Sequence, residues 1–301
     1  MNPPIKSCSL TIEHALKQAK ETLATSESDA SALDAELLLA RTLDQSRTYL
    51  YTWPEKHLSQ SQAQTFFQLI EQRQKGLPVA HLLQEREFWG LPFKVTEHTL
   101  IPRPDTETLV EAALEKLEYA KPHSRQAWSI LDLGTGSGAI ACALAASLPR
   151  NPPALVTAVD LSPQALEVAR WNAQRHHLNI DFQLGRWFAP LQGQTFDLIV
   201  SNPPYIAEED PHLCQGDVRF EPTMALTSGR TGLDDLTEII QQAPKHLYDN
   251  GWLLLEHGYD QADAVQSLLQ IQGFSGIETR QDLHGHPRIT CGQWNHTIRV
   301  K

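Results

Sequence analysis

The sequence has few cysteines, and none of them lies close to another. Its 301 residues contain four, at positions Cys8, Cys142, Cys214 and Cys291. No pair has the Cys-x-x-Cys spacing of zinc and redox sites, and no histidine lies beside them at the spacing of a metal ligand. We therefore predict no metal site, and free thiols of the kind that persist in a reducing cytoplasm.

Long hydrophobic runs are also missing. No apolar stretch approaches the ~20 residues that span a bilayer as a helix. Residues 1–10 include prolines and a lysine and lack the apolar centre of a secretory signal. These absences predict a cytoplasmic protein that does not associate with membranes.

Positive charge is in short supply. Lys and Arg number 25 against 36 Asp and Glu, which gives a formal net charge of −11. A protein that binds duplex nucleic acid needs an excess of basic side chains against the phosphates. We therefore expect no direct binding of duplex nucleic acid, although a local basic surface is compatible with this charge.

The first part of the chain has the apolar spacing of helices only. Apolar residues recur every three or four positions in residues 12–23, 33–43 and 66–70. The aromatic segment 49–54 lies between these runs, and we expect it in their shared core. Residues 1–76 are predicted to form a small helical domain.

The pattern then changes. Residues 77–100 contain two short β-prone segments around the turn Gly90-Leu91-Pro92, which predicts a β-hairpin linker. From residue 129 onward, short apolar runs alternate with amphipathic ones. This alternation predicts an α/β domain over residues 101–301, with a mostly parallel sheet and helices on both faces. Within it, residues 206–232 form a long loop, and such loops are usually functional or mobile.

A glycine-rich segment, Asp132-Leu-Gly-Thr-Gly-Ser-Gly138, follows the first strand expected in this domain. Glycines at such a turn let the backbone approach a ligand closely, because no Cβ intrudes. The G-x-G-x-G spacing differs from the G-x-G-x-x-G of dinucleotide-binding loops, which place a pyrophosphate on a helix N-terminus. Asp132 at its head suits a ligand with a cationic amino group better than a diphosphate. Taken alone, the segment is also compatible with a structural turn.

Asp160 ends the second strand, at the carboxyl edge where α/β sheets bind ligands. Its carboxylate can accept hydrogen bonds from both hydroxyl groups of a ribose. The alternative is that Asp160 caps the following helix, although Ser162 could do so by itself.

The segment Asn202-Pro-Pro-Tyr205 follows the apolar run of residues 196–200. Neither proline can donate to a β-ladder, so a buried strand ends here abruptly. The carbonyl oxygens near Asn202 and Pro203 then lack regular partners, and they lie next to a side-chain amide and an aromatic ring. This arrangement could bind a flat polar group that carries an NH2. Taken alone, a proline-rich turn after a strand is the simpler interpretation.

In their order and spacing, these three segments resemble the class I S-adenosylmethionine-dependent methyltransferases that modify planar nitrogens. The chain is further similar, over nearly its whole length, to the PrmC/HemK family of release factor glutamine N5-methyltransferases. The segments that carry this similarity are residues 34–39, Phe88-Trp89, residues 101–107 and residues 221–233.

The resemblance implies a Rossmann-like methyltransferase domain with S-adenosyl-L-methionine as its cofactor. The glycine-rich loop would wrap the methionine end, Asp160 would hold the ribose, and Trp187 would border the adenine. Trp187 can equally be interpreted as an aromatic residue packed at a strand end. The implied cofactor-binding residues are Gly134, Thr135, Gly136, Ser137, Gly138, Asp160, Trp187 and Asn202.

The resemblance also implies the substrate, which is the glutamine of the Gly-Gly-Gln motif in class 1 peptide chain release factors. Residues 1–76 would then dock the release factor. An amide nitrogen is a poor nucleophile because its lone pair is delocalised, so orientation is the main problem. We expect Asn202 and the Pro203 carbonyl to accept the two amide N–H groups, and Tyr205 to stack on the amide plane. These three residues are assigned to catalysis, and Pro204 joins them in the substrate site.

Three other functions compete with this assignment. Adenine-N6 methylation of DNA or RNA would use the same Asn-Pro-Pro-Tyr chemistry, but the acidic charge and the helical N-terminal region disfavour it. A nicotinamide-dependent oxidoreductase is disfavoured by the glycine spacing, and a non-catalytic interaction protein by the intact set of cleft segments. His257, His284 and His286 are interpreted as structural residues rather than as bases or metal ligands.

Overall fold

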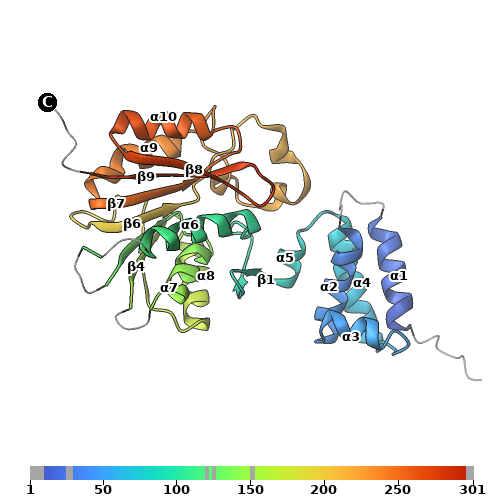
Figure 1. Cartoon of the computed structure of the whole chain (residues 1–301). Coiled ribbons are helices and arrows are strands. Elements are labelled where there is room, and N and C mark those ends of the chain that lie inside the picture. The colour runs from blue at the N-terminus through green and yellow to red at the C-terminus, as the bar shows by residue number, and fades with distance from the viewer. Residues whose placement is uncertain (1–9, 25–29, 119–121, 124–126, 150–152, 296–301) are drawn as a thin grey trace, which may run out of the picture. The chain divides into compact units, whose positions relative to one another are not determined.

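The chain folds as two compact units (Figure 1). The computed structural model describes residues 10–24, 30–118, 122–123, 127–149 and 153–295. One unit comprises Met1–Gln84 and Pro211–Phe220, and the other comprises Glu85–Asp210 and Glu221–Lys301. The division into residues 1–76, 77–100 and 101–301 stays a prediction.

The first unit is helical, as its apolar spacing predicts. The side chains that recur every three or four residues, such as Leu16, Leu38 and Phe66, meet in one buried core. Ser59 and Gln62 form a capping box that starts the fourth helix. The helices are α1 (Ile12–Leu23), α2 (Ser31–Leu43), α3 (Arg47–Thr52), α4 (Gln60–Gln74) and α5 (Val79–Leu83).

The aromatic segment 49–54 contributes less to that core than predicted. Leu50 is buried, but Tyr51 and Trp53 expose 62% and 44% of their surface. The Tyr51 hydroxyl donates a hydrogen bond to Glu36 at 2.5 Å. The rings thus lie at the rim of the unit, because the aliphatic faces of α1, α2 and α4 already supply its core.

The second unit is built on a seven-stranded sheet of order β5-β4-β3-β6-β7-β9-β8. The first five strands in this order are parallel, whereas β9 runs antiparallel to both β7 and β8. The order reverses direction between β3 and β6, which makes this the position where α/β sheets bind ligands. The strands are β3 (Ser129–Leu133), β4 (Leu155–Asp160), β5 (Ile180–Leu184), β6 (Phe196–Ser201), β7 (Leu247–Glu256), β8 (Ser275–Gln281) and β9 (Pro287–Gln293).

Helices cover both faces of this sheet, as predicted for a Rossmann-like domain. Helices α6 (Glu107–Glu118), α7 (Ala139–Ser147) and α8 (Pro163–Arg175) pack on one face, and α9 (Asp234–Gln242) and α10 (Ala262–Gln272) on the other (Figure 1). Successive strand residues therefore enter different cores, since their side chains alternate between faces. Helix α9 was not predicted from the sequence, although its buried Leu236, Ile239 and Ile240 have helical spacing.

Shorter elements connect this framework. Strands β1 (Glu85–Phe88) and β2 (Leu91–Lys94) form the expected hairpin, and η1 (Pro104–Thr106) is a single turn before α6. The long loop 206–232 contains the turns η2 (Pro211–Cys214), η3 (Gly216–Phe220) and η4 (Thr223–Ala225), and a further turn, η5 (Ala243–Lys245), follows α9.

Three of the four cysteines and all the helices named above lie in the described residues. There, Cys142, Cys214 and Cys291 are free thiols, and Cys8 lies outside that part of the chain. No helix in the same residues is long and apolar enough to span a membrane.

Candidate active site

A cleft of about 290 Å³ opens where β3, β4 and β6 end. The glycine-rich loop, the end of β4, the segment 185–187 and the end of β6 all reach it. Segments far apart in the sequence therefore meet at the reversal point of the sheet. Of the predicted site residues, the lining includes Gly134, Gly136, Asp160, Trp187, Asn202 and Pro204.

The glycine-rich loop meets the cleft with its backbone. Gly136 has φ of +55°, and a Cβ at this position would meet no protein atom within 4 Å. A side chain would therefore occupy open space at the cleft, which glycine leaves available to a ligand. Thr135 and Ser137 are both buried, and Gly138 packs against Ala169 of α8.

Asp132 accepts a hydrogen bond from this loop and is not part of the cleft lining. It is fully buried, and its Oδ2 accepts hydrogen bonds from the Thr135 hydroxyl at 2.6 Å and from the Ala141 N–H at 3.2 Å. Burial raises the pKa of Asp132 to about 7. The carboxyl group thus ties the loop to α7, instead of facing the amino group of a ligand as the sequence suggested.

Asp160 lines the cleft and also organises its backbone. Its two oxygens accept the N–H groups of Gly136 and Ser162, each at 2.8 Å. Ser162 itself caps α8, because its hydroxyl accepts the Ala165 N–H at 3.1 Å. A carboxylate has about four acceptor positions, so each oxygen keeps capacity for a ligand. Burial raises the pKa of Asp160, against the lowering effect of these N–H groups.

Trp187 lines the cleft and also packs against the hydrophobic core on one face of the sheet. Its indole N–H donates to Asp235 at 3.2 Å, and its ring lies where a Cβ on Gly134 would come within 3.2 Å. Asp235 also pairs with Arg186 at 2.8 Å. Both interpretations of Trp187 are therefore compatible with its position.

The Asn-Pro-Pro-Tyr segment carries hydrogen-bond acceptors, and contacts with Thr106 and Gln261 hold it in place. Asn202 Nδ2 donates to Thr106 Oγ1 at 3.1 Å, and Gln261 Nε2 donates to the Tyr205 carbonyl at 3.0 Å. Within the described part of the chain, no hydrogen bond reaches Asn202 Oδ1 or the Pro203 carbonyl oxygen. Two acceptors and an aromatic side chain are thus grouped at the end of β6.

Residues 101–107 support the site through specific contacts. Glu221 is buried, accepts the Ile101 N–H at 2.8 Å and forms an ion pair with Arg103. Glu107 accepts a backbone N–H from the β1–β2 hairpin at 2.8 Å. This segment therefore connects the hairpin, the long loop and the Asn-Pro-Pro-Tyr segment.

Known families match both parts of the chain. The PrmC N-terminal domain matches residues 14–83, and a methyltransferase domain matches residues 124–284. The release factor glutamine methyltransferase of Vibrio cholerae serotype O1 is 52% identical over 288 residues, which cover 95% of this chain and 98% of that protein. The chain belongs to this family. Relatives of the same name from Pseudomonas aeruginosa and Escherichia coli K12 are 49% and 44% identical, covering 89% and 94% of this chain and 94% and 98% of their own.

Solved structures show the same fold. A methyltransferase from Pyrococcus furiosus has a TM-score of 0.50 and 18% identity, and covers 68% of this chain and 90% of its own. The hMettl16 catalytic domain has a TM-score of 0.54 and 16% identity, with 82% and 85% covered. At such identities the likeness supports the fold alone.

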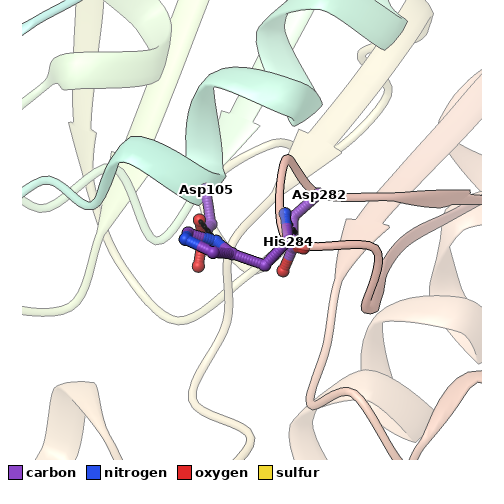
Figure 2. A group of neighbouring side chains, drawn as sticks. All are labelled: Asp105, Asp282 and His284. Atoms are coloured by element: carbon purple, nitrogen blue, oxygen red, sulfur yellow. Dashed lines mark hydrogen bonds and ion pairs between the residues drawn. The ribbon is translucent and has the colours of Figure 1, made fainter.

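Three side chains of metal-binding types converge in this methyltransferase beside η1 (Figure 2). They are Asp105, Asp282 and His284, and His284 Nδ1 lies 3.7 Å from Asp105 Oδ1. The guanidinium of Arg288 lies 3.1 Å from Asp282 and 3.8 Å from Asp105. A second cation would be repelled by that charge, so we assign the cluster to ion pairing.

His257 is a structural residue, in agreement with its interpretation from the sequence. It is fully buried, and both ring nitrogens are hydrogen-bonded, to the Gly258 carbonyl at 2.8 Å and the Thr290 hydroxyl at 2.7 Å. Burial lowers its pKa.

Asp235 and Glu256 escaped the sequence-based prediction, and Thr106 was expected at the cleft as part of residues 101–107 but without a role of its own. Glu256 is fully buried at the end of β7 and accepts a hydrogen bond from the Tyr205 hydroxyl at 3.3 Å. An acid at the carboxyl end of a strand was the signal that identified Asp160, and the same signal could have identified Glu256. Thr106 carried no comparable signal, because its importance depends on a contact with Asn202.

Proposed function

We propose that this protein methylates the side-chain amide nitrogen (N5) of the glutamine in the Gly-Gly-Gln motif of class 1 peptide chain release factors. Relatives that are 44% to 52% identical over nearly the whole chain support this substrate. The structural observation that carries the proposal is a pair of acceptors after β6 that no hydrogen bond within the described residues reaches. They are Asn202 Oδ1, from a residue that lines the cleft, and the carbonyl oxygen of the neighbouring Pro203.

The residues of the cleft suit S-adenosyl-L-methionine as the methyl donor. The backbone at Gly134 and Gly136 admits close approach, the Asp160 oxygens can accept ribose hydroxyls, and Trp187 offers a flat apolar wall. The cofactor supplies a methyl group whose bond to a sulfonium sulfur breaks, leaving its electrons on sulfur, as the bond to nitrogen forms. We include Thr135, Ser137 and Gly138 in this site through their backbone only.

The chain itself contributes orientation and electrostatics. Asn202 Oδ1 and the Pro203 carbonyl accept the two N–H groups of the glutamine amide, which aims the nitrogen lone pair at the methyl group. The same acceptors stabilise the positive charge that develops on nitrogen. The methylated nitrogen is acidic and releases one proton to water, so no strong base is required. Pro204 and the ring of Tyr205 complete the substrate site.

We assign docking of the release factor to the helical N-terminal unit, which corresponds to the PrmC N-terminal domain. A protein with this substrate works in the cytoplasm, where translation ends. Direct binding of duplex nucleic acid is not part of the proposal, because the net charge is −11.

The test is to incubate the protein with labelled S-adenosyl-L-methionine and a class 1 release factor, beside a release factor whose Gly-Gly-Gln glutamine is changed to alanine. We expect label on the first and none on the second. DNA and RNA are offered in parallel, because adenine-N6 methylation uses the same acceptors. Label on nucleic acid, or equal label on both release factors, would refute the proposal.

Asn202→Ala should abolish most turnover while the cofactor still binds. Loss of one group that stabilises a transition state costs on the order of 10²–10³ in rate. Because the other cleft residues are unchanged, cofactor affinity measured by calorimetry should stay near the wild-type value. Retained turnover would contradict the role of Asn202.

A further inference from the structure

Asn202 can serve as an acceptor only if its side-chain amide is turned in one direction. With Oδ1 toward the substrate, it accepts an N–H from the glutamine amide. With the amide reversed, its own N–H groups would face those of the substrate. The two orientations have nearly the same shape, so packing alone does not choose between them. The choice has to come from the partner at the other end of the Asn202 amide.

That partner is Thr106. It is buried, with 4% of its surface exposed, and its Oγ1 lies 3.1 Å from Asn202 Nδ2 as the acceptor. A hydroxyl can donate as well as accept, so it would tolerate either orientation of the amide by itself. The orientation is therefore determined by where the Thr106 proton goes.

The Thr106 hydroxyl lies near the carboxyl group of Glu256, which is able to accept its proton, although no hydrogen bond of standard geometry joins the two side chains. This carboxyl group is fully buried, and its Oε1 receives the Tyr205 hydroxyl at 3.3 Å. Its Oε2 has no partner of standard geometry among the described residues. Burial raises the pKa of Glu256 to about 7, whereas the nearby Thr106 hydroxyl lowers it as a hydrogen-bond donor. A buried carboxyl oxygen without a donor is unfavourable, so a hydrogen bond from the Thr106 hydroxyl would be favoured there.

The backbone holds Thr106 in place. It ends the turn η1, where its N–H donates to the Arg103 carbonyl at 3.1 Å. Prolines at positions 102 and 104 restrict the backbone φ angles of the same segment. Its first residue, Ile101, donates a backbone hydrogen bond to Glu221. The hydroxyl is thus presented to Asn202 from a restrained position.

We propose that Thr106 is a positioning residue that turns the oxygen of Asn202 toward the substrate, with Glu256 as the acceptor of the Thr106 hydroxyl proton. The proposal rests on the proposed function, because it concerns the acceptor that binds the substrate amide. Neither Thr106 nor Glu256 touches the reacting atoms in this assignment.

The first test compares Thr106→Val with Thr106→Ser in the release factor assay. Valine has the shape of threonine but offers no acceptor, so the Asn202 amide loses its preference and kcat should fall about 10- to 100-fold. The KM for the release factor and the affinity for the cofactor should change much less. Serine keeps the hydroxyl and should restore most of kcat.

Thr157→Val is the matched control, since Thr157 is also buried but lies in β4 and is not part of the cleft lining. It should retain wild-type kcat. If Thr106→Val keeps wild-type kcat, or serine does not restore activity, the positioning role is wrong. Failure of the wild-type protein to methylate the release factor would instead refute the proposed function.

The second test examines Glu256→Gln. The glutamine amide can donate to Thr106, which would then donate to Asn202 and favour the reversed orientation. We expect a loss of kcat similar to that of Thr106→Val, and no further loss in the double variant, because both changes remove the same preference. Losses that multiply in the double variant, or wild-type kcat in Glu256→Gln, would refute the connection between the two residues. Cofactor affinity is measured for each variant to confirm that the cleft is intact.

Discussion

Acidic side chains on three parallel strands of one sheet have different surroundings, and these decide what each can do. Asp132 in β3 is fully buried under the glycine-rich loop, where it braces α7. Asp160 at the end of β4 lines the cleft and keeps capacity for a ligand. Glu256 at the end of β7 is buried beside Tyr205 and Thr106. An acidic residue at a strand end is a candidate site residue, but its burial and its hydrogen-bond partners determine its role.

Asp132→Asn should weaken the dependence of stability on pH. The pKa of Asp132 rises from 3.8 to about 7 on folding, so the folded state binds a proton that the unfolded chain releases. Its contribution to stability is fully present below about pH 4 and is lost as the pH rises through about 7. Asparagine does not titrate, so between pH 5 and 8 the variant should gain stability relative to wild type, by on the order of 2 kcal/mol.

The measurement is the free energy of unfolding of the full chain in urea, determined at pH 5 and at pH 8 for the variant and the wild type. The exposed acid Glu167 on α8 provides the control variant, Glu167→Gln, which should follow the wild-type pH dependence. An unchanged pH dependence in Asp132→Asn would contradict the assignment.

At the scale of elements, the loop that follows β6 ends close to where it began, because the backbone at Gly232 packs against the backbone of Tyr205. Gly232 has φ of +73°, and a Cβ there would lie 2.1 Å from the Tyr205 carbonyl oxygen. Gln261 joins the same place, since its Nε2 donates to the carbonyls of Tyr205 and Thr231 at 3.0 and 3.3 Å. The position of Tyr205 thus depends on the end of the loop as well as on its start.

Gly232→Ala should reduce methyl transfer by roughly tenfold or more, because its Cβ displaces Tyr205 and misplaced catalytic groups are costly. Gly193→Ala is a matched control. Its φ is +74°, so it carries the same backbone strain, but a Cβ there meets no atom within 4 Å. The measurement is kcat of both variants in the release factor assay. Equal losses would show that strain, and not the contact with Tyr205, is responsible.

At the scale of the whole molecule, the chain passes between its two units at residues 84–85, 210–211 and 220–221. Within the first unit, Arg73 holds the returning segment Pro211–Phe220. Its guanidinium forms ion pairs at 2.7 Å with both Asp34 and Asp217, and Arg73 and Asp34 each expose 9% of their side chains. A buried arginine between two carboxylates therefore links this segment to the helices.

Arg73→Gln should destabilise the first unit by about 3 kcal/mol, because removal of one partner leaves a buried charge uncompensated. Lys75→Gln is the control, since the pair of Lys75 with Glu71 is exposed and such pairs contribute little. Thermal unfolding measures the stability, and limited proteolysis measures the protection of residues 211–220. Unchanged protection in Arg73→Gln would refute this role of Arg73.

The sequence by itself determined the elements of this protein and its three functional segments. Hydrophobic spacing of 3.6 or two residues is a local property, so most helices and strands of both units could be predicted from it. Helices α3, α5 and α9 were not predicted. Glycines after β3, an acid at the end of β4 and prolines after β6 are local signals as well, and the structure places residues of all three segments at one cleft.

Only the tertiary structure decided which side chains become partners. It turned Asp132 inward, placed residues 211–220 in the first unit, and brought Thr106 to Asn202 across 96 positions of the chain. Such contacts depend on how elements pack within each unit, the sheet with the turn η1 in the second unit and residues 211–220 with the helices in the first. Periodicity specifies which face of an element is buried, but it does not specify which distant residue lies opposite that face.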